Sequence, residues 1–244
     1  MSGSPGRLCN HIIRAHAAHF LAKKGNIRFC YGEYMSDMVR LGIILFTDGE
    51  DATSNYTVEY NETTFFRSIV SDHIPVRYNI NLNTCYCQTR EFSNYLYQYY
   101  RLLENQMPII RANPYNRRYR CNNDVFIHVR LGDVESYNPG YSYYDTCLRA
   151  ISFENGYLAS DSLDHEICQK LIQTYSLRIV DTKEVDTIQF GSTCRHIVLS
   201  GGTFSYIIGL FAFYSTVYYP DDIGLWYPPE LFSIPDWNKV TIQT

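Results

Sequence analysis

Short apolar runs and longer amphipathic runs alternate along the second half of the chain, and this alternation limits what the chain can fold into. The apolar runs span 125–130, 156–159, 177–180, 197–199 and 216–219, and the helix-like runs span 141–151, 163–175, 184–194 and 203–214. Strands that alternate with helices are joined by crossover connections and form a parallel sheet covered on both faces. The pattern therefore predicts an α/β fold with a mostly parallel sheet.

The first half of the chain has a less regular pattern. Residues 10–24 have an apolar face and predict a helix that Asn10 caps and Gly25 ends. Further helices are expected at 34–42 and 89–106, and strands at 27–31 and 43–46. Residues 50–87 are polar, rich in Asn and Thr, and show no period that favours one structure.

A basic segment that contains Pro114, residues 111–122, separates the two patterns. It has neither a helical nor a strand period, and such segments often connect domains. With 244 residues, the chain is long enough for one large domain or two small ones. We therefore expect an N-terminal domain over 1–115 and a C-terminal domain over 116–244.

The composition indicates a folded protein and excludes some partners. Apolar residues make up 45% of the chain and charged residues 19%, as in typical globular proteins. The net charge of −4 provides no basic field for nucleic acid, so no nucleic-acid partner is expected. The longest apolar run, near 206–212, is shorter than the roughly 20 residues that a membrane-spanning helix needs, so no such segment is expected.

The eight cysteines favour buried thiols over a metal site or a disulfide scaffold. None of them forms a Cys-x-x-Cys pair, and Cys85-x-Cys87 is shorter than the usual zinc knuckle. Their density is also below that of disulfide-rich secreted domains. We expect a reducing compartment and hence a cytoplasmic protein, with a trimmed enzyme of the secretory pathway as the alternative.

Arg130 comes at the end of the most apolar predicted strand, directly before a Gly-Asp turn. An arginine fixed at that position suits a phosphate or carboxylate ligand, because its planar fork binds two oxygens at once. The alternative is an arginine held in a salt bridge with Asp133 or Glu135. The residue type and position thus predict an anion clamp, and the salt bridge remains open.

A second anion site is predicted where a strand ending at Leu199 meets a helix. A Gly201-Gly202 turn joins them, and Thr203 and Ser205 follow in the first helical turn. Glycines let a phosphate approach the backbone, and the N-terminus of a helix directs amides and a positive dipole toward it. The alternative is an ordinary helix cap by Thr or Ser.

Several polar residues follow the predicted strands at what would be one edge of the sheet. They are His128, Arg130, Ser160, Asp161, Thr203 and Ser205. Ligands of open parallel sheets bind beyond the carboxyl ends of the strands. The positions together predict a single nucleotide site.

The run His128-Val129-Arg130-Leu131-Gly132-Asp133 resembles the His-x-Arg-x-Gly-Asp motif of the fucosyltransferase superfamily, which includes α1,2-, α1,6- and protein O-fucosyltransferases. Three other segments are similar to motifs of that family and occur in the same order. They are Gly6–His11, similar to a Gly-x-x-Gly-Asn-Gln loop, Ala159–Ser162, similar to a Ser-Asp-Asp loop, and Gly202–Ser205, similar to a Thr/Ser-rich motif. The resemblance spans nearly the whole chain.

This resemblance implies a compact GT-B-like architecture with two Rossmann-like halves, of which the first carries the acceptor surface and the second the nucleotide. It implies transfer of L-fucose from GDP-fucose to a hydroxyl of a glycan or glycoprotein acceptor. Inversion at the anomeric carbon without a metal ion or other cofactor is also implied. Arg130 would clamp the diphosphate, together with Thr203, Ser205 and the backbone at Gly202.

The remaining candidate residues have more specific roles under this resemblance. Asn10 and Ser160 belong to the loops that would line the donor site. Asp161 or Asp186 would accept hydrogen bonds from guanine, and each is alternatively a helix cap. Phe204 would pack under the base or fill the core.

The acceptor hydroxyl would lose its proton to a general base, for which Asp133 and Glu135 are the candidates. His128 would orient Arg130 or touch the phosphates, or it is a buried strand histidine with its hydrogen bonds satisfied.

Two interpretations of the function compete with fucose transfer. One is a transferase that uses GDP-rhamnose, GDP-mannose or a UDP-sugar, and the other is a non-catalytic glycan-binding module. A compact enzyme without an anchor would suit a microbe or a virus.

Overall fold

The computed structural model describes residues 6–53, 56–72, 78–82, 84–221 and 229–241. The chain divides into two compact units, Met1–Phe92 and Ser93–Thr244, which are described separately below. Helix α4 (Arg90–Arg101) spans the division. The boundary expected at residues 115 and 116 therefore falls inside the second unit.

Among the described residues of the second unit, six strands form one sheet in which every pairing is parallel. The strands are β3 (Val125–Val129), β4 (Gly156–Ser160), β5 (Arg178–Ile179), β6 (His196–Val198), β7 (Thr216–Pro220) and β8 (Asn238–Val240). This sheet confirms the α/β fold with parallel strands that the alternating pattern predicts. The short strand β8 was not anticipated.

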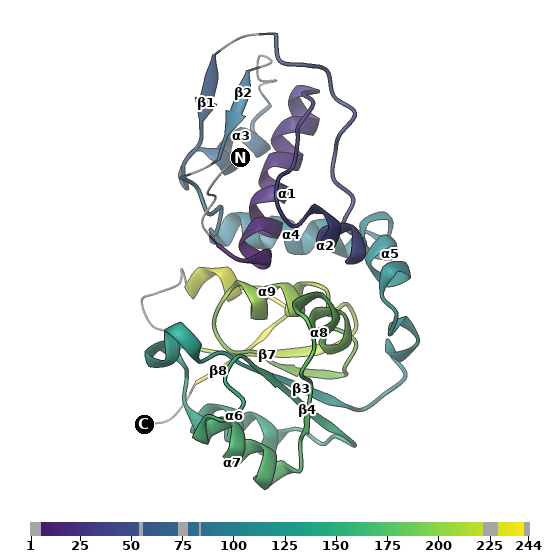
Figure 1. The fold of residues 1–244 in the computed structure, drawn as a ribbon, viewed down its shortest axis with the longest axis vertical. Coiled ribbons are helices and arrows are strands. Elements are labelled where there is room, and N and C mark those ends of the chain that lie inside the picture. The colour runs from purple at the N-terminus through teal and green to yellow at the C-terminus, as the bar shows by residue number, and fades with distance from the viewer. Residues whose placement is uncertain (1–5, 54–55, 73–77, 83, 222–228, 242–244) are drawn as a thin grey trace. The chain divides into compact units, whose positions relative to one another are not determined.

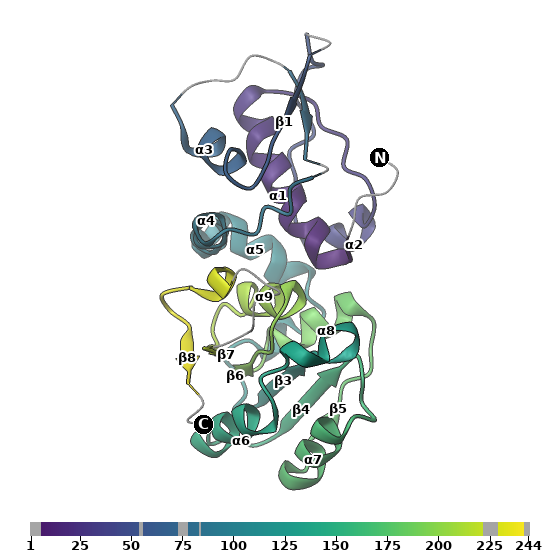
Figure 2. The same ribbon diagram turned by 90° about the vertical axis from the view of Figure 1, so that its left-hand side faces the viewer.

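Helices cover both faces of this sheet, as Figures 1 and 2 both show. Helices α6 (Tyr141–Ala150) and α7 (Glu166–Tyr175) lie on one face. Helices α8 (Glu184–Gly191) and α9 (Thr203–Leu210) lie on the other. The unit also contains α5 (Leu103–Ala112) and the short 3-10 helices Asn116–Arg118, Gly132–Tyr137 and Pro229–Phe232.

The strand order is β5-β4-β3-β6-β7-β8, so the chain reverses its direction of progress across the sheet once. It starts in the middle at β3, moves outward to β5, returns to the middle at β6 and then moves outward on the other side. Adjacent parallel strands whose connections leave in opposite directions form a topological switch point. In this sheet the switch point lies between β3 and β6, and the order is that of a Rossmann-like fold.

The core of the second unit explains why β3 is central. All five residues of β3 are buried, which is expected for a strand covered by helices on both faces. On one face, Val125, Ile127 and Val129 belong to a cluster that includes Tyr143 and Tyr144 of α6. The Tyr143 hydroxyl donates a 2.8 Å hydrogen bond to the carbonyl oxygen of Leu199, so α6 is tied to the residue that directly follows β6, the strand beside β3.

Helix α1 (Leu8–Gly25) dominates the first unit. Its N-cap is Arg7, so Asn10 lies inside the helix and is not the cap that the sequence suggests. At the other end Asn26 adopts the left-handed conformation, with φ of 49°, and ends the helix one residue beyond Gly25. Asparagine is one of the few residues that tolerate this conformation, because its short side chain can bond locally.

The rest of the first unit contains α2 (Met35–Arg40), α3 (Phe65–Val70) and a parallel pair of three-residue strands, β1 (Thr57–Glu59) and β2 (Asn79–Asn81). The strands expected at 27–31 and 43–46 are not formed, apart from a single parallel bridge between Ile27 and Glu50. Within the described part of this unit there is thus no second complete Rossmann-like half.

The rings of Phe20, Phe65 and Phe92 hold the helices of the first unit together. The Phe65 and Phe92 ring centroids are 5.1 Å apart, and those of Phe20 and Phe92 are 6.2 Å apart, both in edge-to-face geometry. Lys24 donates hydrogen bonds to the carbonyl oxygens of Ser68 (2.8 Å) and Ile69 (3.2 Å), which belong to the last turn of α3. A cation at that end of a helix complements its dipole.

The expected helix at 89–106 is two helices, α4 and α5. Leu102 separates them because its backbone is extended, with φ of −70° and ψ of 132°. Over the described residues, no helix combines the length and apolar character needed to cross a membrane.

Replacing Gly209 of α9 by alanine should destabilise the second unit. A Cβ atom there would lie 2.6 Å from the ring of Trp237, which is buried. We expect the free energy of unfolding to fall by about 1–3 kcal/mol, since overpacking outweighs the gain in helix propensity. Urea denaturation measures this change. The control Gln173→Ala, at an exposed position of α7, should stay within about 0.5 kcal/mol. An unchanged midpoint for Gly209→Ala would contradict the packing.

Candidate functional site

The carboxyl ends of β3 and β6 meet at the switch point, and most of the predicted site residues follow these two strands. His128 lies in β3 and Arg130 directly after it, while Gly202, Thr203, Phe204 and Ser205 form the start of α9 after β6. β3 pairs with β6 from Val125 opposite His196 to Ile127 opposite Val198. The two anion-binding elements that the sequence predicts separately are therefore neighbours.

The Arg130 side chain is held by two carboxylates. Its guanidinium forms ion pairs with Asp133 and with Asp161, and only 14% of its side chain is exposed. The salt bridge to Asp133, which the sequence left open as an alternative, is thus formed. Asp161 was not among the partners considered for Arg130.

Asp161 also fixes the backbone of the loop that follows β3. Its Oδ1 accepts a 3.0 Å hydrogen bond from the amide of Leu131, while its Oδ2 pairs with Arg130. Gly132 has φ of +34°, and a Cβ atom there would lie 2.5 Å from Asp161 Oδ2. Only glycine allows this close approach of the loop to the carboxylate. The Gly-Asp turn of the motif is therefore explained by the contact between the loops that follow β3 and β4.

Two residues that the sequence analysis missed hold the backbone of Arg130. The Oγ of Ser200, two residues after β6, accepts a 3.2 Å hydrogen bond from the Arg130 amide. The side chain of Asn138 donates a 2.8 Å bond to the Arg130 carbonyl oxygen. Asn138 precedes a Pro-Gly turn, which is a signal for a structural asparagine. No local pattern distinguishes Ser200 from an ordinary strand-end serine.

His128 links β3 to α9 inside the sheet edge. Its Nδ1 lies 2.6 Å from the Oγ of Ser205, and both side chains are buried. Burial, and secondarily the charge of Arg130, lower the pKa of His128 from 6.5 to about 3. The neutral ring therefore positions the start of α9, and this satisfied strand histidine matches one of the alternatives that the sequence left open. The Phe204 ring lies beside it, with centroids 5.0 Å apart.

The start of α9 carries no capping side chain, because its N-cap is Gly202. Gly202 has φ of 97°, a conformation that side chains rarely adopt. Thr203 and Ser205 are the first and third residues of the helix and are not its cap, so the capping alternative does not hold for them. Helix N-termini without a capping side chain leave amides directed outward, which is the arrangement that binds anions.

The two carboxylates proposed as general base both belong to the 3-10 helix Gly132–Tyr137 and both have cationic or hydrogen-bonding partners. Asp133 pairs with Arg130, and its side chain is 56% exposed. Glu135 Oε1 lies 3.1 Å from His165 Nε2, and its side chain is 66% exposed. The structure thus places both near the end of β3, on the solvent side.

The other predicted residues have separate surroundings. Ser160 ends β4, and its Oγ accepts a 3.0 Å hydrogen bond from the Ser162 amide. Asp186 lies in the first turn of α8, half-buried, and the cap of that helix is Lys183. Asp161 is not a helix cap either, because α7 is capped by His165. The capping alternative is therefore wrong for both aspartates.

Asn10 belongs to the first unit, where its Oδ1 accepts a 3.0 Å hydrogen bond from Gln88 Nε2. Gly6 packs directly on it, since a Cβ atom at Gly6 would lie 2.6 Å from the Asn10 side-chain nitrogen. Gly6 and Asn10 thus form one local unit at the start of α1.

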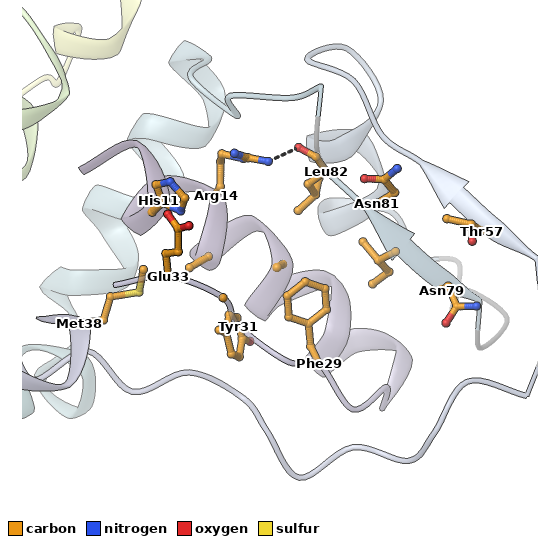
Figure 3. Close-up of a pocket in the computed structure, with 14 residues that line it drawn as sticks. His11, Arg14, Phe29, Tyr31, Glu33, Met38, Thr57, Asn79, Asn81 and Leu82 are labelled. Carbon is orange, nitrogen blue, oxygen red and sulfur yellow. Dashed lines mark hydrogen bonds between the residues drawn. The ribbon is translucent and has the colours of Figure 1, made fainter. Parts of the chain in front are cut away.

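The first unit contains a cavity of about 310 Å³ beside α1 (Figure 3). Phe29 and Tyr31 provide aromatic rings along one wall, and Thr57, Asn79 and Asn81 provide polar groups at one end. Arg14 points toward Leu82, which also lines the cavity, and donates a 2.8 Å hydrogen bond to its carbonyl oxygen. Its size and mixture of rings and polar groups are those of a small-molecule pocket.

His11 and Glu33 lie together at the opposite end of this cavity from Asn79 and Thr57, as Figure 3 shows. The cavity therefore has the ionisable side chains of His11 and Glu33 at one end and side-chain amides at the other. Apart from His11, which belongs to the Gly6–His11 segment, these residues were not predicted from the sequence, because they come from separate segments without a common motif.

Within the described ranges, no three His, Cys, Asp or Glu side chains are grouped as metal ligands. Comparisons of the chain with protein-family models, with curated proteins and with solved structures found no match. The assignment of a function to this site therefore depends on the geometry of the site itself.

The low pKa of His128 can be tested by NMR. The folded protein binds fewer protons than the unfolded chain between pH 6.5 and about 3, so the stability contribution of neutral His128 is present above pH 6.5 and is lost as the pH falls toward 3. We expect the His128 ring resonances to stay constant from about pH 8 to pH 5, whereas those of the urea-unfolded chain should titrate near pH 6.5. Titration of His128 near pH 6.5 in the folded protein would contradict its burial.

Proposed function

We propose that this protein is a glycosyltransferase that moves a sugar from a nucleotide diphosphate sugar to a hydroxyl group of a glycan acceptor. One observation carries the proposal: at the switch point of the sheet, Arg130 directly follows β3, and the uncapped N-terminus of α9 follows the neighbouring parallel strand β6. GDP-fucose is the donor that we favour, because the residues at this site resemble the fucosyltransferase motifs. No metal ion has a role in the proposed reaction.

The proposed reaction needs positive groups where the leaving group develops its charge. The bond between the anomeric carbon and the β-phosphate oxygen breaks, the acceptor oxygen attacks that carbon, and the nucleoside diphosphate leaves with the bonding electrons. The guanidinium of Arg130, the amides at the start of α9 and the hydroxyl of Thr203 would stabilise this diphosphate. Inversion would follow from attack on the face opposite to the leaving group.

Arg130 would have to exchange one partner for the diphosphate. Asp133 is the partner that leaves in this proposal, because its side chain is 56% exposed, against 28% for Asp161, so that water can solvate its carboxylate once the pair opens. Asp161 would stay, because it holds both the guanidinium and the Leu131 amide. Asp161 is therefore proposed as a positioning residue for Arg130, and the reading of guanine is left to Asp186.

The exchange would also release a base. Once the diphosphate replaces it on Arg130, the Asp133 carboxylate can accept the proton of the acceptor hydroxyl. Glu135, two residues further along the same 3-10 helix, is the second candidate. The reaction would then be balanced: the acceptor proton is on a carboxylate, the sugar is on the acceptor oxygen, and the nucleoside diphosphate is free.

A glycan-binding module without transferase activity is the second candidate function, and the cavity of the first unit favours it. Aromatic rings and side-chain amides, as supplied there by Phe29, Tyr31, Asn79 and Asn81, suit a sugar ring with its apolar face and its hydroxyl groups. In the transferase proposal the same kind of surface would serve the acceptor. The two candidates differ in whether a nucleotide binds.

Thermal denaturation with nucleotides tests the proposal. GDP at a hundredfold excess over its dissociation constant should stabilise the protein by about 2.7 kcal/mol, and UDP and ADP should stabilise it less. Arg130→Lys should lose the GDP effect, because lysine keeps the charge but not the planar fork. Arg149→Lys, at an exposed position of α6, is the matched control and should keep it. A rise in the denaturation temperature with UDP alone would indicate a UDP-sugar as the donor. No rise with any nucleotide would favour the glycan-binding module.

Transfer assays would then measure the catalytic contribution of Arg130 and Thr203. With a saturating donor, Thr203→Ala and Arg130→Lys should each lower kcat about 10²–10³-fold, as found when one donor to a developing anion is removed. The expected product is an inverted, α-linked sugar from a β-linked donor. Unchanged kcat in both variants would contradict the assignment of the diphosphate position.

Substitutions of the two aspartates that pair with Arg130 should change the affinity for GDP in opposite directions. Asp161→Asn removes the anchor of the loop and should weaken GDP binding roughly tenfold, about 1.4 kcal/mol. Asp133→Asn removes the charge that competes with phosphate and should strengthen GDP binding by a few-fold. Calorimetric titration with GDP measures both. Equal weakening by the two substitutions would contradict the proposed exchange of partners.

A further inference from the structure

Two thiols in the first unit lie against each other. The Sγ atoms of Cys85 and Cys87 are 3.2 Å apart, and the two residues are 1% and 0% exposed. Tyr86 between them is 42% exposed, so the chain at this point is a surface turn that directs both sulfur atoms inward. The single intervening residue does not separate the sulfurs, because the backbone of Cys87 is in the left-handed region, with φ of 57°.

The carboxylate of Glu62 holds this turn in place. It accepts hydrogen bonds from three successive amides, those of Tyr86 (2.5 Å), Cys87 (3.1 Å) and Gln88 (3.2 Å). A carboxylate that bonds three consecutive amides fixes their backbone conformation. The left-handed conformation at Cys87, which costs energy in a non-glycine residue, is thereby stabilised together with the approach of the two sulfurs.

We propose that Cys85 and Cys87 form a reversible intramolecular disulfide by exchange with a low-molecular-weight disulfide such as glutathione disulfide. The thiolate of one cysteine attacks a sulfur of glutathione disulfide and releases one glutathione thiolate, which takes up a proton. The thiolate of the other cysteine then attacks the protein sulfur of this mixed disulfide and releases the second glutathione. The protein loses two hydrogens and two electrons, and one glutathione disulfide becomes two glutathione molecules.

The second step is what distinguishes this pair from a single buried thiol. A sulfur already in contact with the mixed disulfide needs only a small movement to displace glutathione, so the intramolecular bond forms in preference to a stable mixed disulfide. The first step requires the turn to open, because burial of Cys87 raises the pKa of its thiol and favours the unreactive protonated form. Opening involves a surface turn held by the exposed Glu62.

The turn is also connected to the cavity beside α1. The carbonyl oxygen of Leu82 accepts hydrogen bonds from the Cys85 amide (3.1 Å) and from Arg14 Nη2 (2.8 Å). Leu82 and Arg14 both line the cavity. The disulfide would therefore tighten the segment that forms one wall of the cavity, and oxidation should be detectable in the backbone around this wall.

Peptide mapping of the full-length protein tests the proposal. The reduced protein is equilibrated in glutathione buffers of increasing disulfide content, quenched with acid, alkylated and digested with trypsin. The tryptic peptide 78–90 contains Cys85 and Cys87 and no other cysteine. We expect it to lose two hydrogens, to escape alkylation and to recover fully with dithiothreitol. The exposed Cys30 and Cys121 should carry mixed glutathione disulfides, which shows that the oxidant acted.

The outcome that would overturn the proposal is complete alkylation of Cys85 and Cys87 under conditions where Cys30 and Cys121 are modified. A mixed glutathione disulfide on either residue of the wild-type pair would overturn it as well. In Cys85→Ser or Cys87→Ser, by contrast, the remaining thiol should accumulate such a mixed disulfide. Cys147→Ser, which removes a buried thiol of α6, is the matched control and should leave oxidation of the pair unchanged.

Hydrogen exchange gives an independent readout that does not depend on a substitution. Oxidation should slow exchange of the amides of Tyr86, Cys87 and Gln88 at least several-fold, because the turn must open for these amides to exchange. The amides of α6 and α7 should exchange at the same rate in both redox states. Equal exchange of the turn in the oxidised and reduced protein would show that no bond constrains it.

Discussion

The parallel pairing of β3 with β6 is the constraint on which the rest of the site depends. The two strands are far apart in sequence, and Arg130 follows β3 while Gly202, the N-cap of α9, comes soon after β6. Because they are neighbours with the same direction, their carboxyl ends open toward the same place. Ser200 strengthens this arrangement, since it lies two residues after β6 and accepts a hydrogen bond from the backbone of Arg130 after β3. His128 does the same inside the sheet through its bond to Ser205 of α9.

Electrostatics then determine what this edge of the sheet can do. Arg130 is mostly buried and is neutralised by two aspartates of different character. Asp161 is part of the scaffold, because it also binds the backbone and excludes any side chain at Gly132. Asp133 is more exposed than Asp161, and it is the partner that an anionic ligand replaces in our proposal. In our proposal, phosphate replaces one partner of Arg130 while the other stays, and in the absence of ligand the guanidinium is paired with both aspartates.

The sequence predicted the second unit well and the first unit poorly, for a physical reason. The strands and helices after residue 125 have short connections and strong periodicity, so local signals suffice for the elements that form most of the sheet. The order of the strands is not a local property, because it depends on contacts between segments that are far apart in sequence. Ser200 and Asn138 could be identified as partners of the Arg130 backbone only once this order was known. In the first unit, Asn10 looked like a cap but lies inside α1, and 27–31 looked like a strand but forms a single bridge. Tertiary contacts overrode propensity there.

NMR of the arginine side chains tests the central claim most directly, because it observes Arg130 itself as a nucleotide binds. The account predicts that GDP shifts the Nε–H resonance of Arg130 together with the backbone amides of Thr203, Phe204 and Ser205, and leaves the resonance of Arg149 unchanged. If GDP binds and shifts resonances elsewhere while those of Arg130 and the start of α9 stay in place, the switch point of this sheet is not the nucleotide site.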